Sequence, residues 1–237
     1  ASDVYKRQQK GGVLMNLILF SSFFGDKKVH DFIMEKSKNR DPKICVIPSF
    51  TNFYGVTSTG EYRALVKMGF NHENMSMFDV GYLWDETKVD SLMENDVIIL
   101  GGGNTFLFQW LLHTHDMLNI LNRFVSNGGI LIGESAGSIM MSKTVEIARF
   151  ADPDIVGSGN TDGIGLVNFN MKPHFGSWIK NLGDFVDWSR MHDGDLYCLF
   201  DGGYIIVDDG ATTPYGDYIR FNNGKVKDFC LRGHYDY

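Results

Sequence analysis

Short apolar runs alternate with segments of helical periodicity through the first 132 residues of this 237-residue chain. The runs cover residues 17–20, 44–47, 75–78, 97–100 and 130–132. Between them, residues 29–35, 61–68, 105–112 and 117–125 carry apolar side chains at spacings of three and four, as amphipathic helices do. Strands that alternate with helices build a parallel sheet covered on both faces. The pattern therefore predicts an α/β fold with a three-layer, doubly wound, mostly parallel sheet.

The pattern changes after about residue 194, where short apolar runs are separated by turn residues. These runs cover residues 196–200, 204–207, 218–221 and 226–229, and they predict antiparallel hairpins at one edge of the same domain. No repeat, low-complexity tract or linker interrupts residues 15–237, which we expect to form a single domain. Residues 1–14 are polar and lack the apolar centre of a signal peptide, so we expect a non-native or disordered leader before Met15.

Charge and composition narrow the classes of partner. The net charge is −7, without the clustered Lys and Arg that nucleic-acid binding requires. No apolar stretch approaches the roughly 18 residues of a membrane span. The three cysteines are odd in number and lack CxxC spacing, which disfavours a disulfide framework or a zinc site. We therefore expect a cytoplasmic protein with no nucleic-acid or membrane partner, no metal and no cofactor.

The segment Gly133-Glu134-Ser135-Ala136-Gly137 fits the pattern G-x-S-x-G and lies between a predicted strand and a predicted helix. A nucleophile elbow at this point forces its serine into a strained conformation, and glycines on either side avoid collisions with neighbouring chain. The Ala136 amide then lies at the start of a helix, where it can face an anion. The alternative is that Ser135 only caps the following helix, a common use of serine.

A second glycine cluster, Gly101-Gly102-Gly103-Asn104-Thr105, follows the strand predicted at residues 97–100. The carboxyl ends of parallel strands share one edge of a sheet, so this cluster is expected beside Ser135. Its backbone can present a second N–H group to an oxyanion, and Gly103 is the predicted donor. A phosphate loop is the competing interpretation, but the cluster has neither a Walker lysine nor G-x-G-x-x-G spacing.

A serine nucleophile needs a base, and His174 is the candidate among seven histidines because it ends a constrained segment in Pro173-His174-Phe175. The combination of G-G-G-N-T-F, G-E-S-A-G and P-H-F resembles the peptidase E family of serine peptidases. These enzymes are related to aspartyl dipeptidases and cyanophycinases and share the class I glutamine amidotransferase-like fold. The resemblance extends from about Met15 to His174 and is weak beyond it.

The resemblance implies roles for individual residues. Ser135 matches the family nucleophile, His174 its general base, and Gly103 and Ala136 the two oxyanion-hole amides. Counting back from the histidine, the triad aspartate falls on Asp152. Two further acids stay open, Asp154 as an alternative and Glu146 as a weaker one. Asn104 and Glu134 are expected to contact substrate.

These residues imply a peptidase that hydrolyses small, dipeptide-like substrates through an acyl-enzyme, as a monomer or homodimer. Specificity for an acidic residue is doubtful, because the segment after His174 offers only Lys180 and Arg190 as cations. A catalytically silent binding or regulatory protein of the same fold is the alternative. A glutaminase is disfavoured, because that chemistry on this fold uses cysteine at the position of Ser135.

Overall fold

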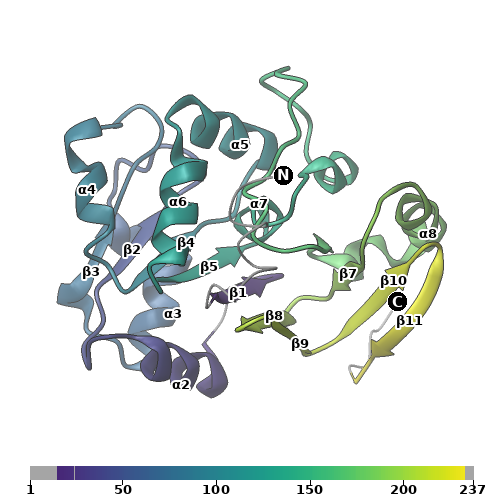
Figure 1. Ribbon diagram of the computed structural model, residues 1–237, viewed down its shortest axis with the longest axis horizontal. Coiled ribbons are helices and arrows are strands. Elements are labelled where there is room, and N and C mark those ends of the chain that lie inside the picture. The colour runs from purple at the N-terminus through teal and green to yellow at the C-terminus, as the bar shows by residue number, and fades with distance from the viewer. Residues whose placement is uncertain (1–14, 24, 233–237) are drawn as a thin grey trace.

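A seven-stranded sheet forms the centre of the computed structural model, which describes residues 15–23 and 25–232. Its strand order is β3-β2-β4-β5-β1-β8-β9, and the five strands from β3 to β1 are parallel (Figure 1). The strands are β1 (Asn16–Phe20), β2 (Ile44–Ile47), β3 (Met75–Met77), β4 (Val97–Leu100), β5 (Ile130–Glu134), β8 (Tyr204–Asp208) and β9 (Ala211–Tyr215). Strand β8 pairs antiparallel with both β1 and β9, so the last two strands extend the parallel sheet at one edge.

Alternating side chains of the central strands enter two different hydrophobic cores. On β1, Ile18 and Phe20 pack with helices α2 (Lys27–Lys36) and α3 (Gly60–Met68). Leu17 and Leu19 point to the other face, where they pack with α5 (Thr105–Thr114), α6 (Met117–Ser126) and α7 (Ala136–Met140). Figure 1 shows α2 and α3 on one side of the sheet and α5 and α6 on the other. A strand buried on both faces needs continuous apolar residues, which these runs supply.

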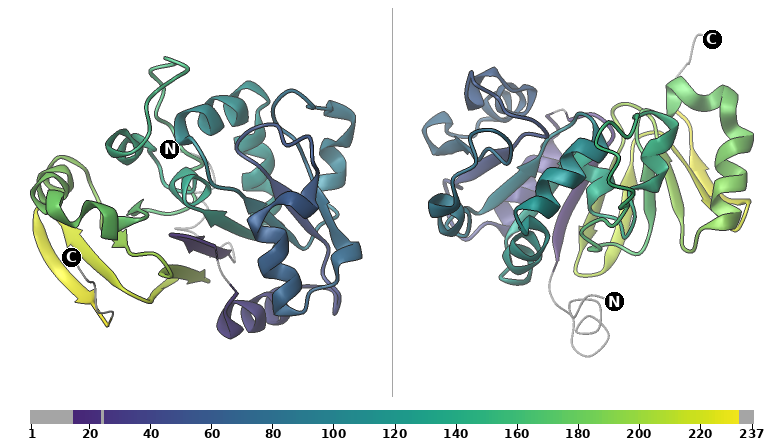
Figure 2. Two further views of the ribbon diagram at one scale, coloured as in Figure 1. Left: turned by 180° about the vertical axis from the view of Figure 1, so that it is seen from behind. Right: turned by 90° about the horizontal axis from the view of Figure 1, so that it is seen from above.

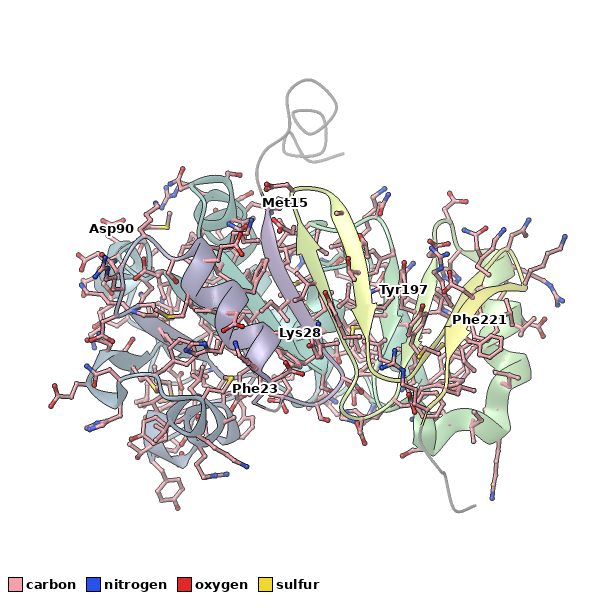
Figure 3. The ribbon with its side chains drawn as sticks, turned by 90° about the horizontal axis from the view of Figure 1, so that it is seen from below. Met15, Phe23, Lys28, Asp90, Tyr197 and Phe221 are labelled. Atoms are coloured by element: carbon pink, nitrogen blue, oxygen red, sulfur yellow. The ribbon has the colours of Figure 1, made fainter. Side chains whose placement is uncertain are left out.

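A second sheet of four strands stands beside the first, in the order β11-β10-β7-β6 (Figures 1 and 2). It contains β6 (Asn170–Lys172), β7 (Leu196–Leu199), β10 (Tyr218–Asn222) and β11 (Lys225–Cys230). Strands β6 and β7 are parallel, whereas β10 is antiparallel to both β7 and β11. Tyr197 on β7 and Phe221 on β10 are labelled in this sheet in Figure 3. Helix α8 (Leu182–Met191) packs against β10.

Short helical segments complete the connections. Among the residues that the structure describes, they comprise α4 (Val89–Leu92) and 3₁₀ turns at Val56–Ser58, His72–Asn74, Glu86–Lys88, Glu146–Phe150 and Phe175–Asn181. Within residues 15–23 and 25–232, no helix is long and apolar enough to cross a membrane.

The predicted α/β class and doubly wound sheet are confirmed, and β2 and β4 have the predicted bounds. Two strands were missed, β6 and β9. The predicted C-terminal hairpins are present, but they divide: β8 and β9 join the edge of the large sheet, while β10 and β11 belong to the second sheet. The leader expected at residues 1–14 lies outside the described residues.

Candidate active site

The turn from β5 to α7 is so tight that two of its positions accept only glycine. A Cβ atom on Gly137 would lie 2.1 Å from the carbonyl oxygen of Leu100 on β4, and one on Gly133 would lie 2.5 Å from the backbone nitrogen of Ser138. Both distances are far below van der Waals contact. The two glycines therefore let α7 begin directly against the ends of two strands, with Ser135 at the apex.

Ser135 adopts φ 48° and ψ −106°, a conformation that non-glycine residues rarely take. Its backbone nitrogen donates to the Phe20 carbonyl at 3.0 Å, which fixes the apex to β1. Although Ser135 occupies the N-cap position of α7, its hydroxyl makes no capping hydrogen bond. The hydroxyl instead lies 3.0 Å from His174 Nε2. Its geometry is that of a serine held toward a base.

His174 reaches this position from the second sheet, because it follows β6 by two residues. It also has positive φ, at 55°. Its backbone nitrogen donates to Ser21 Oγ at 2.8 Å, and Ser21 is fully buried just beyond the end of β1. Ser21 Oγ also lies 3.3 Å from both the Leu199 carbonyl and Asp201 Oδ1. One hydroxyl thus ties the histidine backbone to the end of β7.

Asp201 is the acid that faces the histidine. Its Oδ1 lies 2.5 Å from His174 Nδ1, on the side of the ring opposite Ser135. Because β6 and β7 are parallel neighbours, with Lys172 beside Cys198, the segments after them emerge side by side. The side chains of His174 and Asp201 are 40% and 64% exposed, so the group is open to solvent. The arrangement suits a proton relay from a hydroxyl to an imidazole oriented by a carboxylate.

The three acids expected at this point lie elsewhere. Asp152 Oδ2 accepts a hydrogen bond from the Thr105 amide at 2.8 Å, so this carboxylate binds the first turn of α5. Asp154 accepts from Gly157 within its own loop, and Glu146 lies 3.2 Å from His192 Nε2. The structure therefore does not bring Asp152 to His174, whose Nδ1 faces Asp201 instead. The first backbone amides of a helix have no partner within the helix and attract a carboxylate, and Asp152 binds at such a helix start.

The glycine loop after β4 lies directly beside Ser135. A Cβ atom on Gly102 would lie 3.6 Å from Ser135 Cβ, and the Gly102 carbonyl accepts from Ser49 Oγ at 2.5 Å. Gly103 has φ 137°, and a Cβ there would fall 2.0 Å from Ser49 Oγ. In the described part of the chain, the Gly103 and Ala136 N–H groups donate to no other residue. The Gly103 amide, in the loop after β4, and the Ala136 amide, at the first residue of α7, thus both lie in segments that adjoin Ser135.

The two residues expected to contact substrate have partners within the protein. Asn104 caps α5 through Oδ1, which accepts from Leu107 N at 2.9 Å, and its amide donates to the Pro153 carbonyl. Both ends of this side chain are therefore engaged. Glu134, at the end of β5, accepts hydrogen bonds from the Phe23 and Gly102 amides. Its carboxyl group thus lies beneath the glycine loop.

Glu134 also contacts the buried carboxyl group of Glu61 on α3. Burial and this second carboxyl raise the pKa of Glu134 from 4.5 to about 7, while the two backbone amides act in the opposite direction. Two carboxylates that share a buried site cannot both ionise at low cost. The neutral form of Glu134 is therefore favoured up to a higher pH than in an ordinary glutamate.

Lys172 is a buried cation directly before the turn that carries His174. Its ammonium group donates to the Pro173 carbonyl at 3.2 Å and lies 4.8 Å from the centre of the Trp178 ring. Burial lowers the pKa of Lys172 to about 8, and the nearby Cys198 and Asp152 oppose that shift.

Among the described residues, no group of three His, Cys, Asp or Glu side chains is arranged to hold a metal ion.

The missed residues left weak signals in the sequence. Asp201 directly follows the apolar run predicted at residues 196–200, but Asp201-Gly202-Gly203 reads equally well as a hairpin turn. Ser21 directly follows the first strand, where a small polar residue carries no specific signal. Asp201 differs from the other acids only because β7, which precedes it, pairs with β6, which precedes His174. Strand β6 has three residues and lies within a segment rich in Gly and Asn.

Known proteins match this chain over most of its length. The model of peptidase family S51 matches residues 17–213. A peptidase E from Nostoc sp. is 30% identical over 209 residues, which cover 82% of this chain and 79% of that protein. An uncharacterised peptidase of Listeria monocytogenes is 32% identical over 168 residues, or 68% of this chain and 78% of the relative.

Two solved structures share the fold. A crystal structure from Listeria monocytogenes that carries the name peptidase E has a TM-score of 0.66, with 22% identity, 85% of this chain covered and 98% of the other. A peptidase from an acI-B1 Actinobacterium has a TM-score of 0.63, with 16% identity and coverage of 95% and 98%. At these identities, the structures support the α/β fold alone.

Proposed function

Because the chain belongs to peptidase family S51, we propose that this peptidase is of the serine type and hydrolyses small peptides through Ser135, His174 and Asp201. The observation that carries the proposal is the line of contacts through the imidazole, 3.0 Å from Nε2 to the serine hydroxyl and 2.5 Å from Nδ1 to the carboxylate. A histidine with a purely structural role does not require a hydroxyl at one ring nitrogen and a carboxylate at the other. This arrangement supports nucleophilic catalysis rather than helix capping.

His174 transfers a proton in each step, as a bond to the acyl carbon forms or breaks. His174 Nε2 takes the Ser135 proton as Oγ attacks the peptide carbonyl, and Asp201 stabilises the imidazolium that results. The negative charge on the former carbonyl oxygen faces the amides of Gly103 and Ala136. The C–N bond then breaks as His174 returns the proton to the departing amine. His174 then takes a proton from water as its oxygen attacks the acyl carbon, and the C–Oγ bond breaks as the imidazole gives that proton to Ser135 Oγ, which releases the acyl part as a carboxylic acid.

Activity-based labelling tests the proposal before any substrate is known. A fluorophosphonate probe should label the wild-type protein on Ser135, as mass spectrometry of the modified peptide will show. Ser135→Ala should abolish labelling, whereas Ser138→Ala removes a buried serine of the same helix that donates only to backbone carbonyls and should retain it. Absence of labelling in folded wild-type protein would contradict the proposal and favour a silent binding protein of this fold.

Hydrolysis is then measured with a library of di- and tripeptides at pH 7 to 8. We expect release of free amino groups by the wild type and a loss of several orders of magnitude in Ser135→Ala and His174→Ala. Cleavage that continues unchanged in Ser135→Ala would contradict the assignment of the nucleophile.

A further inference from the structure

Large exposed apolar side chains gather on two neighbouring loops at the carboxyl edge of the main sheet. The loop after β2 contributes Phe50, Phe53 and Tyr54, and the loop after β3 contributes Tyr82 and Leu83. Their exposures are 57%, 68%, 86%, 84% and 47%. The Phe53 and Tyr82 rings lie 6.1 Å apart between centroids, which joins the two loops into one surface. Single exposed apolar residues are ordinary, but a contiguous group of aromatic rings marks a binding surface.

A buried carboxylate holds these loops in place. Asp79 is 8% exposed and accepts hydrogen bonds from the Gly81 and Leu83 amides at 2.8 and 3.1 Å. It also accepts from Thr51 Oγ1 and from the Asn52 amide, both in the other loop. The rings are therefore presented on a fixed frame rather than on a loose loop. A loop backbone that is already held in one conformation loses little conformational entropy when a ligand binds.

The surface is continuous with the proposed active site. Ser49 Oγ donates to the Gly102 carbonyl, and a Cβ atom on Gly103 would lie 3.9 Å from the Phe50 ring. Phe50 therefore adjoins the predicted oxyanion loop. His174 enters from the opposite side, because it follows β6 in the second sheet, whereas β2 and β3 lie beyond β4 in the main sheet.

This geometry gives the substrate a direction. His174 must return a proton to the departing amine, so the part of the peptide C-terminal to the scissile bond lies on the histidine side. The acyl part, N-terminal to that bond, leads away from His174 toward the glycine loop and the aromatic rings. Residues 48–60 contain no Asp, Glu, Lys or Arg. Arg63, the cation that reaches this loop, already donates to the Ser58 carbonyl at 3.1 Å, so the loop itself supplies no cation for an acidic side chain.

We propose that Phe50, Phe53, Tyr54 and Tyr82 form an aromatic wall that binds an apolar or aromatic side chain on the acyl side of the scissile bond. The proposal rests on the proposed peptidase function and names the substrate class of that site. The wall makes the enzyme selective for peptides with Phe, Leu or a similar residue N-terminal to the bond, and it discriminates against Asp at that place.

The test uses the full chain and short fluorogenic amides with one common leaving group and Phe, Leu, Ala or Asp as the acyl residue. In the wild type we expect kcat/KM for Phe to exceed that for Ala by about tenfold or more, with Asp lowest. In Phe50→Ser, and in the double variant Phe53→Ser and Tyr82→Ser, the ratio of Phe to Ala should fall toward one through KM. Phe229→Ser removes a comparably exposed ring, 64% exposed on β11 in the second sheet, and should keep the wild-type ratio.

The outcomes separate the two proposals. If the wild type cleaves the amides but the wall variants keep its selectivity, the wall is refuted and the peptidase proposal stands. If no amide or library peptide is cleaved, both proposals fail. Light scattering is measured on every variant, because the wall could instead join two copies of this chain. Loss of a dimer in the wall variants with unchanged selectivity overturns the inference.

Discussion

Ser135 and His174 have backbone angles that their side chains do not favour, with φ of 48° and 55°. Such conformations cost on the order of 1 kcal/mol or more each and persist only where surrounding contacts impose them. Here the Ser135 amide is bonded to Phe20 and the His174 amide to Ser21, at the end of the same strand and in the residue after it. Both residues are thus bonded to the end of β1, and this shared attachment sets the distance between the Ser135 hydroxyl and the His174 imidazole.

The first prediction separates the two candidate acids. Asp201→Asn removes the charge beside His174 Nδ1 and no longer selects the tautomer with a proton on that nitrogen. The rate of fluorophosphonate labelling of Ser135 should fall by about four orders of magnitude. Asp152→Asn should leave that rate within about tenfold of the wild type and cost about 1 kcal/mol of unfolding free energy, because it weakens the start of α5.

Both variants are measured by the labelling rate and by urea unfolding monitored with circular dichroism. A larger loss of labelling in Asp152→Asn than in Asp201→Asn would reverse the assignment. That result would require His174 to turn toward α5 in solution.

The second prediction concerns Glu134, whose pKa of about 7 exceeds the ordinary 4.5. Folding therefore favours the neutral form. This stabilising contribution is complete below about pH 4.5 and is lost as the pH rises through 7, where the charge must be buried beside Glu61. Glu134→Gln keeps a neutral group at every pH. Its stability relative to the wild type should therefore increase by about 2 kcal/mol between pH 5 and pH 8.

Urea unfolding of the wild type and Glu134→Gln at pH 5, 6, 7 and 8 measures how the difference in their unfolding free energies depends on pH. Glu73→Gln, at an exposed position, serves as the matched control and should show no such trend. A stability difference between Glu134→Gln and the wild type that stays constant with pH would rule out a raised pKa of Glu134.

At the scale of elements, the turn from β5 to α7 requires glycine because there is no room for a side chain, not because the chain must be flexible there. Gly137→Ala places a methyl group 2.1 Å from the Leu100 carbonyl oxygen, which is backbone and can yield only if α7 moves. We expect it to cost about 3 kcal/mol or more and to slow labelling of Ser135. Gly183→Ala on α8 meets nothing within 4 Å and should gain about 0.5 kcal/mol, because alanine favours a helix.

Thermal unfolding of the two glycine variants beside the wild type checks the contrast. Equal effects of the two substitutions would mean that the elbow adapts to a side chain, and that the close approach of α7 to β4 is not required.

At the scale of the whole molecule, the site combines residues from both sheets. Ser135 follows a strand of the large sheet, whereas His174 and Asp201 follow β6 and β7 of the second. The serine and the glycine loop were predictable, because glycine patterns report local backbone needs. The histidine required a family resemblance. Asp201 could not be found in this way, because its role depends on the parallel pairing of β6 with β7, which has no local signature in the sequence.

A shared core indicates that the two sheets unfold together. Leu17 and Leu131 of the large sheet belong to the same buried cluster as Leu196 and Phe221 of the second. Separate folding units would each have a core of their own. We therefore predict one cooperative transition for residues 15–237, although chains of this length often unfold through intermediates.

Two single-tryptophan variants test that prediction. One keeps Trp84, which packs beside Phe78 after β3, and the other keeps Trp188 on α8 beside the second sheet. Urea unfolding followed by fluorescence should give the same midpoint and slope for both, and the far-ultraviolet circular dichroism should coincide with them. Fluorophosphonate labelling should disappear in the same range. An earlier transition at Trp188, with loss of labelling while Trp84 stays folded, would show that the second sheet opens alone and removes His174 and Asp201 from Ser135.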